Sequence, residues 1–246
     1  MAERKGRLID LHKLNPDEVL AEEFLPEYSR GMQFFHLELV HLNANIFILD
    51  HVLNFPFGIL VPSGRSLFFR FVFENFFYAS LLNITRMAAD QAADFFTLPQ
   101  FRNKVRQAVK PEYHDPFDDL LREVRFEPQI SATLEKARAL RSQRVAHSAR
   151  DMVLGESQEP LVRFGDLKEL RDHLVSVLHA LAFNVDHILH PVQYSPGIQH
   201  QVGRVSRSDI EELLDLLAEH SSALHLPDNS PDEWKIRKAT SSEREL

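Results

Sequence analysis

The chain contains no cysteine and only 8 glycines in 246 residues. Without cysteine it forms no disulfide bond and offers no thiolate metal ligand, which suits a reducing compartment. Scarce glycine, together with few stretches that alternate polar and apolar residues, argues against a β-rich fold. The sequence also lacks a glycine-rich phosphate loop and a Gly-x-Ser-x-Gly elbow. It therefore matches neither a mononucleotide-binding loop nor a hydrolase nucleophile motif.

Long uninterrupted apolar runs are absent as well. The most apolar stretch, residues 67–82, contains Arg70, Glu74 and Asn75 and is therefore a poor membrane span. Residues 1–14 carry charges but no apolar segment, so we expect no signal peptide. Hydrophobic residues make up 44% of the chain, which is ample for a core. We expect a soluble, cytoplasmic protein that makes no membrane contact.

Positive charge is the scarcer sign, since the net charge is −8. Contact with a nucleic acid therefore has to come from a local basic patch. Two runs without an acidic residue qualify. The Arg102–Lys110 run, with Lys104 and Arg106, is either a solvated helix face or part of an RNA-binding path. The Arg138–Arg150 run surrounds one histidine, His147, with four arginines: Arg138, Arg141, Arg144 and Arg150.

Helical periodicity and capping residues predict an all-α fold. One apolar stripe is especially regular, stepping by three or four through Leu167, Leu170, Leu174, Val177, Leu181, Val185 and Ile188. In the first part of the chain, we expect helices from Asn15 to before Pro26, over about 27–53, over about 66–89 and within 92–109. Further along, we expect a short helix over about 117–124 and a helix from Pro128 through the arginines. Two more helices are expected, one from Asp166 to about Leu189 and one that begins at Ser208. We expect one helical domain over residues 1–226 and a flexible polar tail over 227–246, with Trp234 as its one large apolar side chain.

The helix expected over 66–89 is apolar almost all round, which predicts a central position in a bundle. One strip of it is polar and consists of Asn75, Asn83, Arg86 and Asp90, at steps of 8, 3 and 4. This strip has two interpretations. It is either a surface stripe with an Arg86–Asp90 ion pair, or a polar wall that faces a site formed by Arg141 and His147.

Two patterns raise the possibility of a metal site. Glu38-x-x-His41 is half of a di-iron signature, which needs a second such pair and two more carboxylates. His187-x-x-His190 beside Asp186 also offers ligands, although histidines are favoured at the end of a helix for electrostatic reasons. A metal-binding helical bundle therefore remains a third hypothesis, while the leading interpretation uses neither a metal nor a cofactor.

Arg141-x5-His147, in the setting Leu-Arg-Ser-Gln-Arg-Val-Ala-His-Ser, resembles the Arg-x(4–6)-His motif of HEPN domains. It is most similar to the abortive-infection, AbiU2-like branch. Asn83-Ile-Thr-Arg-Met-Ala-Ala-Asp90 also resembles an earlier helix of that family. The resemblance spans about residues 66–190 and implies a HEPN-like antiparallel helical bundle, to which this chain adds N-terminal helices.

The resemblance implies a metal-independent endoribonuclease of bacterial defence, or a toxin. The 2′-hydroxyl of RNA would attack the neighbouring phosphorus, with His147 as general acid or base. Arg141 would hold the phosphate, and Arg144 and Arg150 would guide the backbone. The supporting residues are Arg138, Ser142, Arg144, Arg150, Asn83, Arg86 and Asp90. The implied partners are RNA, a second copy of the chain, and an antitoxin such as a nucleotidyltransferase.

Six residues along an ideal α-helix place Arg141 and His147 about 120° apart and about 9 Å along the axis. The two side chains therefore do not share a face. Either the helix ends near Ala146, or the arginine and the histidine meet across a two-fold interface. The resemblance implies the second arrangement, because HEPN proteins characteristically build their site at a dimer interface.

Ser142 departs from the pattern of many active HEPN nucleases, which carry Asn, Asp or His directly after the motif arginine. A serine is a weaker orienting group. An alternative is therefore a HEPN module without catalysis that binds RNA, a nucleotide or a protein partner.

Overall fold

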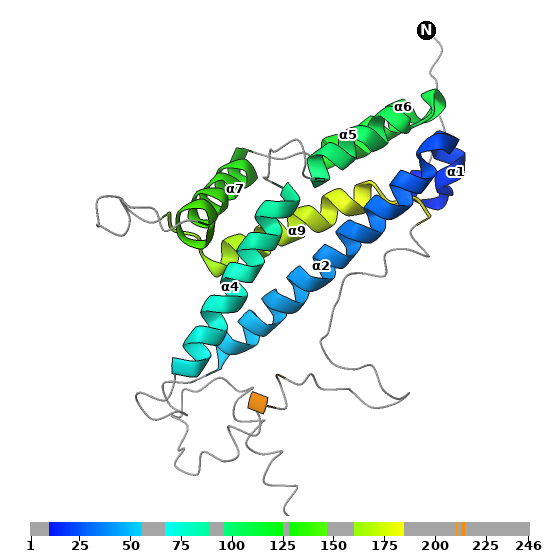
Figure 1. Cartoon of the computed structure of the whole chain (residues 1–246). Helices are drawn as coiled ribbons and strands as arrows, with labels where there is room; N and C mark the ends of the chain where they lie inside the picture. Colours follow the sequence, from blue (N-terminus) through cyan, green and yellow to red (C-terminus); the bar gives the residue numbers. More distant parts are fainter. Residues whose placement is uncertain are drawn as a thin grey trace, which may run out of the picture. The chain divides into compact units, whose positions relative to one another are not determined.

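The structure is a computed structural model, and its secondary structure within the described residues is helical (Figure 1). The exception there is one isolated β-bridge between Leu20 and Val109. The all-α prediction is confirmed. None of the helices in this part of the chain is both long and apolar enough to span a bilayer. The structure describes residues 10–55, 67–88, 96–124, 128–146, 160–184, 210 and 213–214.

Short helices precede the long ones. The 3₁₀ helices η1 (Leu11–Lys13) and η2 (Glu22–Phe24) lie on either side of α1 (Pro16–Val19). The remaining elements are α2 (Leu25–Asn54), α4 (Leu67–Ala88), α5 (Leu98–Ala108), η3 (Pro111–Tyr113), α6 (His114–Glu123), α7 (Pro128–Leu140), the π-helix η4 (Arg141–Ala146) and α9 (Phe164–Ala180).

The first predicted helix is wrong in length. It begins as expected, with the Asn15 N–H donating to the Glu18 carboxylate at 2.6 Å. It ends at Val19 because the chain then pairs with the segment after α5. The Ala21 N–H donates to the Ala108 carbonyl, and the Lys110 N–H donates to the Val19 carbonyl, both at 2.8 Å. Pro26 lies in the first turn of α2 rather than after a helix end, a position where proline is tolerated.

The bounds of the helix predicted from Asp166 to about Leu189 are also wrong. The helix begins at Phe164, and the Asp166 carboxylate accepts the Arg163 N–H at 2.7 Å from inside the first turn. It ends at Ala180, and Asn184 has a positive φ of 56°. The expected apolar stripe is buried as far as the structure describes it, from Leu167 to Leu181. Val185 and Ile188 lie outside the described residues.

The chain divides into two compact units. Unit 1 consists of residues 1–43 and 78–194, and unit 2 of residues 44–77 and 195–246. In unit 1, α9 packs against both α6 and α7, and α5 packs against α6 (Figure 1). The expectation of one domain over residues 1–226 stays a prediction.

An aromatic cluster forms part of the core of unit 1. The ring centroids of Tyr28 and Phe183 are 5.6 Å apart, and those of Phe35 and Phe101 are 5.5 Å apart. Gly31 lies beneath the Phe101 ring so closely that a Cβ added there would be 2.4 Å from it. Glycine at this position therefore allows α5 to pack directly against the backbone of α2.

Unit 2 contains the last turns of α2 and the first half of α4. Leu49 and Phe69 are buried there, and the rings of Phe47 and His51 contact each other at a tilt of 34°, with centroids 4.1 Å apart. Leu214, in the helical turn near the C-terminal end of the described residues, is only 1% exposed. This unit therefore buries side chains from both of its sequence segments.

Candidate functional site

The predicted motif helix changes its winding at the motif. α7 ends at Leu140, and Arg141 begins the π-helix η4, which continues to Ala146. A π-helix closes i→i+5 hydrogen bonds; it is rare, usually only one turn long, and frequently found at functional sites. Arg138 lies in the last turn of α7, whereas Arg141, Ser142 and Arg144 lie in η4. The angular geometry expected from an ideal α-helix therefore does not apply over Arg141–Ala146.

Arg141 is held in a partly buried position. Its Nε atom has no contact with solvent, although the side chain as a whole is half-buried. Its neighbour in η4, Gln143, also has a buried side-chain oxygen, Oε1, with no hydrogen-bond partner within the described residues. Partial burial strengthens electrostatic interactions because water screens them less. Arg141 is thus placed where its charge acts more strongly than on an open surface.

The other motif residues differ in exposure. Ser142 is exposed, and Arg138 lies 3.8 Å from Glu135 in a partly exposed ion pair on the same helix. His147, Arg150 and the side chain of Arg144 lie outside the described residues, and so does Asp90. The arrangement of Arg141 relative to His147 stays a prediction.

The polar strip on α4 makes contacts that its sequence pattern does not indicate. Asn75 is exposed and donates from Nδ2 to the Phe71 carbonyl of its own helix at 2.8 Å. Asn83 is half-buried. Arg86 forms an ion pair with Glu38 of α2, a residue 48 positions away that the sequence does not connect with it. The side chain of Glu38 is 10% exposed and that of Arg86 47%, so the carboxylate anchors a guanidinium that still reaches the surface.

Glu38 is also one half of the expected metal pattern. Its Oε1 contacts Arg86, and His41, the other half, is exposed on α2. In the part of the chain that the structure describes, no three histidine or acidic side chains come together in a way that would hold a metal ion. His187 and His190 lie outside that part.

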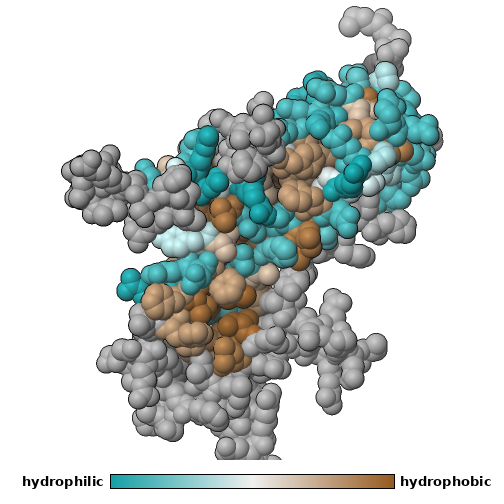
Figure 2. Space-filling model, in the orientation of Figure 1, coloured by the Kyte–Doolittle hydropathy of each residue, from teal (hydrophilic) through white to brown (hydrophobic). Residues whose placement is uncertain are grey.

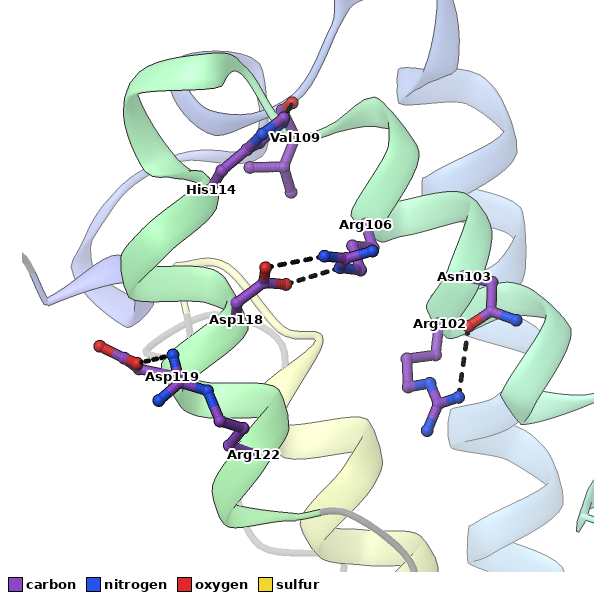
Figure 3. A network of polar contacts seen from close by, with 8 residues as sticks. All are labelled: Arg102, Asn103, Arg106, Val109, His114, Asp118, Asp119 and Arg122. Atoms are coloured by element: carbon purple, nitrogen blue, oxygen red, sulfur yellow. Dashed lines mark hydrogen bonds and ion pairs between the residues drawn. The ribbon is translucent and has the colours of Figure 1, made fainter.

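The Arg102–Lys110 run is engaged in intramolecular contacts. The Arg106 guanidinium binds the Asp118 carboxylate of α6 through two hydrogen bonds, of 2.6 and 2.8 Å (Figure 3). This contact raises the pKa of Arg106 and lowers the pKa of Asp118. Lys104 pairs with Glu27 of α2, and Lys110 donates to two backbone carbonyls at the end of α1. These contacts disfavour the interpretation of this run as an RNA-binding path.

Neighbouring side chains extend this contact network (Figure 3). Arg102 donates to the side-chain oxygen of Asn103 at 3.2 Å, and Arg122 pairs with Asp119 on α6. The His114 ring donates from Nε2 to the Val109 carbonyl at 2.7 Å, at the turn between α5 and α6. The Arg106–Asp118 pair joins α5 to α6, and the His114–Val109 hydrogen bond stabilises the turn between them.

A set of polar contacts that the sequence does not reveal joins the N-terminal segment to the end of α9. We call it the N-terminal contact cluster; it contains His12, Asn15, Tyr28, His179 and residues 181–184. The Tyr28 hydroxyl donates to the Leu181 carbonyl at 3.0 Å and accepts the Phe183 N–H at 3.1 Å. Burial raises the pKa of Tyr28 to about 12.

Two histidines lie at the edge of this cluster. The His12 ring donates from Nδ1 to the Ala182 carbonyl at 2.8 Å, which fixes its tautomer because a carbonyl only accepts. Its ring centroid lies 4.7 Å from that of His179. Desolvation of the partly buried ring lowers the pKa of His179, and the nearby His12 lowers it further. Nδ2 of Asn184 donates to the Asn15 side-chain oxygen at 2.6 Å and completes the cluster.

Comparison with known families decides the affiliation of the chain. Residues 36–204 match the HEPN family described as AbiU2. The chain belongs to this family. The matched residues are more than half of the chain and include both Asn83–Asp90 and the arginine–histidine motif, so the resemblance inferred from these segments is confirmed. This AbiU2-family protein is an abortive-infection-related HEPN module. No curated protein and no solved structure matches it.

Proposed function

We propose that this AbiU2-family protein is a metal-independent endoribonuclease of bacterial defence, or a toxin, whose site contains Arg141 and His147. The observation that carries the proposal is the Arg141-x5-His147 motif within the matched residues 36–204. The position of Arg141 supports it. This arginine is partly buried and opens a π-helix, a winding that is often associated with functional sites.

The chemistry requires two proton transfers and one phosphate-binding cation. The 2′-hydroxyl of RNA attacks the neighbouring phosphorus, and the bond from phosphorus to the 5′ oxygen breaks. The products are a 2′,3′-cyclic phosphate and a free 5′-hydroxyl. One proton leaves the 2′ oxygen and one joins the 5′ oxygen, and His147 serves as the general acid or base. DNA resists because it lacks the attacking hydroxyl.

Arg141 binds the phosphate that is attacked. A guanidinium offers parallel N–H donors to phosphate oxygens and remains charged at all relevant pH values. Its partial burial favours this role, because weaker screening increases its effect on the charge that builds up on those oxygens. Arg144 and Arg150 guide the RNA backbone in the proposal, and Arg138 supplies further positive charge.

RNA is thus the proposed substrate, and a second copy of the chain is the proposed partner in the site. A neutralising protein, such as a nucleotidyltransferase antitoxin, completes the set of proposed partners. The exposed Ser142 next to Arg141 favours a second candidate, a HEPN module that binds RNA without cleaving it. A serine orients the motif less firmly than the longer polar side chains that many active relatives have there.

Cleavage of total RNA in EDTA tests the proposal. We expect the wild-type protein to produce cyclic phosphate ends, and His147→Ala to lose cleavage while retaining RNA binding. His41→Ala is the matched control, because this histidine is exposed on α2 and is not part of the proposed arginine–histidine site. Equal cleavage by wild type and His147→Ala would refute a site at His147. RNA binding without cleavage in all three proteins would favour the non-catalytic module.

Mixing two inactive variants tests whether the site crosses a two-fold interface. Arg141→Ala and His147→Ala, each inactive alone, form mixed dimers in which one of two composite sites is intact. Random exchange of subunits then restores about a quarter of the wild-type activity. If both residues act within one chain, the mixture stays inactive while sedimentation still reports dimers.

A further inference from the structure

The first half of α4 carries an apolar surface in unit 2. Phe68 is 63% exposed and Phe71 is 53% exposed. These phenylalanines are three residues apart on the helix and so lie on the same side of it, and we call them the apolar face. Figure 2 shows hydrophobic residues gathered over the part of unit 2 where α4 begins and α2 ends (compare Figure 1). Adjacent exposed phenylalanines are typical of a binding surface.

Part of the C-terminal segment is already buried in the same unit. Leu214 is 1% exposed, although it stands 137 residues beyond the end of the α4 portion of the unit at Phe77. Residues 195–246 and 44–77 together make up unit 2. The chain beyond Leu214 therefore starts from a point fixed within the unit that carries the apolar face.

The length of the segment between Leu214 and Trp234 can be compared with the length of α4. Trp234 follows Leu214 by 20 residues, which span up to about 70 Å when extended. α4 has 22 residues and is about 33 Å long at the α-helical rise. The segment from Leu214 to Trp234 is thus about twice as long, when extended, as the whole of α4.

The chemistry of the tail matches that of the face. Trp234 is the single tryptophan of the chain, and Glu233 and Lys235 flank it with opposite charges. Next to Phe71 on α4, Arg70 and Glu74 form an exposed ion pair of 2.9 Å. An indole ring packs favourably against phenylalanine rings, and the flanking charges can pair with Arg70 and Glu74.

We propose that the apolar face is the docking site of this chain's own C-terminal tail, residues 227–246, with Trp234 packed against Phe68 and Phe71. The physical reason is that an aromatic residue near the chain end loses unfavourable contact with water when it covers an exposed aromatic surface. Docking within the chain also requires no encounter of two molecules, because the buried Leu214 keeps the tail at a high effective concentration.

Fluorescence of Trp234 tests the proposal in the full chain, since no second tryptophan contributes. We expect blue-shifted emission and acrylamide quenching several-fold weaker than that of N-acetyltryptophanamide. The double variant Phe68→Ser/Phe71→Ser restores quenching to the free value. The matched control Leu161→Ser, which changes an apolar residue of unit 1 that is 67% exposed, leaves the emission unchanged.

Ile236→Ser provides a second variant that leaves α4 intact, and we expect it to increase quenching as well. Circular dichroism verifies the fold of every variant. Solvent-like emission in the wild type, or protection that survives in both variants, would overturn the proposal. So would protection that disappears over a hundredfold dilution as sedimentation reports monomers, because a second copy would then cover the face.

Discussion

The chain contains two basic runs that look alike in sequence and differ in structure. In the Arg102–Lys110 run, Arg106 binds Asp118, Lys104 binds Glu27 and Lys110 binds two carbonyls. All of these partners belong to other elements, and the run lies on the regular helix α5 and its C-terminal end. This run stabilises the packing of the elements around α5.

The Arg138–Arg150 run begins at the end of α7 and continues into the π-helix. Arg138 and Glu135 form an ion pair there that is long, at 3.8 Å, and joins residues of the same helix. The comparison teaches that an acid-free stretch does not indicate available positive charge. Acids from distant segments, such as Asp118 and Glu27, decide whether the cations of such a stretch take part in packing.

The largest expected effect is on the rate of RNA cleavage, which we expect to depend on the Arg138–Arg150 run and not on the Arg102–Lys110 run. We expect Arg141→Lys, which keeps the charge but loses the parallel donors, to lower RNA cleavage about 10²-fold or more. Arg106→Lys, the matched change in the other run, leaves the cleavage rate unchanged. Initial rates on one labelled RNA measure both variants. A comparable loss in the two variants would show that the Arg102–Lys110 run takes part in RNA cleavage.

The next largest expected effect is a loss of stability, and it concerns a residue outside both basic runs. Tyr28→Phe removes the hydroxyl of the N-terminal contact cluster and leaves the Leu181 carbonyl and the Phe183 N–H without their partner. We expect a loss of about 1–3 kcal/mol in the free energy of unfolding, with cleavage per folded molecule unchanged. Urea denaturation measures the loss. Tyr113→Phe is the control. An equal loss in that variant would show that the hydrogen bonds of the Tyr28 hydroxyl contribute no particular stability.

A smaller loss of stability is expected where α5 packs on α2. Gly31→Ala gains about 1 kcal/mol of helix propensity but places a methyl group against the buried Phe101 ring, at a cost of about 1–3 kcal/mol. The net result is a modest decrease in the free energy of unfolding. Gly165→Ala is the matched control, because a Cβ there meets nothing within 4 Å. A stabilised Gly31→Ala protein would show that α5 shifts freely.

The smallest expected effect depends on pH. The pKa of His179 is lowered in the folded protein, so the unfolded chain binds a proton here more readily. The stability contributed by neutral His179 is present above the ordinary pKa of about 6.5 and is lost as pH falls through the lowered value. The melting temperature, measured at pH values between about 7.5 and about 5.5, reports this loss. His179→Gln should flatten the dependence, and a slope equal to that of the wild type would exclude His179 as its source.

Much of the fold follows from local patterns. The proline, asparagine and acid at residues 15–18 start α1, and the three-and-four spacing from Leu167 to Leu181 predicts the buried stripe of α9. The motif segment was also visible, because its residue types and spacing are local properties. The family match confirms this affiliation for residues 36–204.

The ends and partners of these elements depend on contacts between distant residues. α9 stops at Ala180 although its apolar stripe continues, and the backbone after it is bound instead by Tyr28 and His12. Arg86 pairs with Glu38 of α2, a residue that sequence spacing does not connect with it. By itself, the sequence determined the helices, their apolar faces and the position of the arginine–histidine motif, because these depend on residues a few positions apart. Only the tertiary structure decided which cations are neutralised, where α9 ends and that the motif winds as a π-helix, because those outcomes depend on packing and on backbone hydrogen bonds that sequence spacing does not specify.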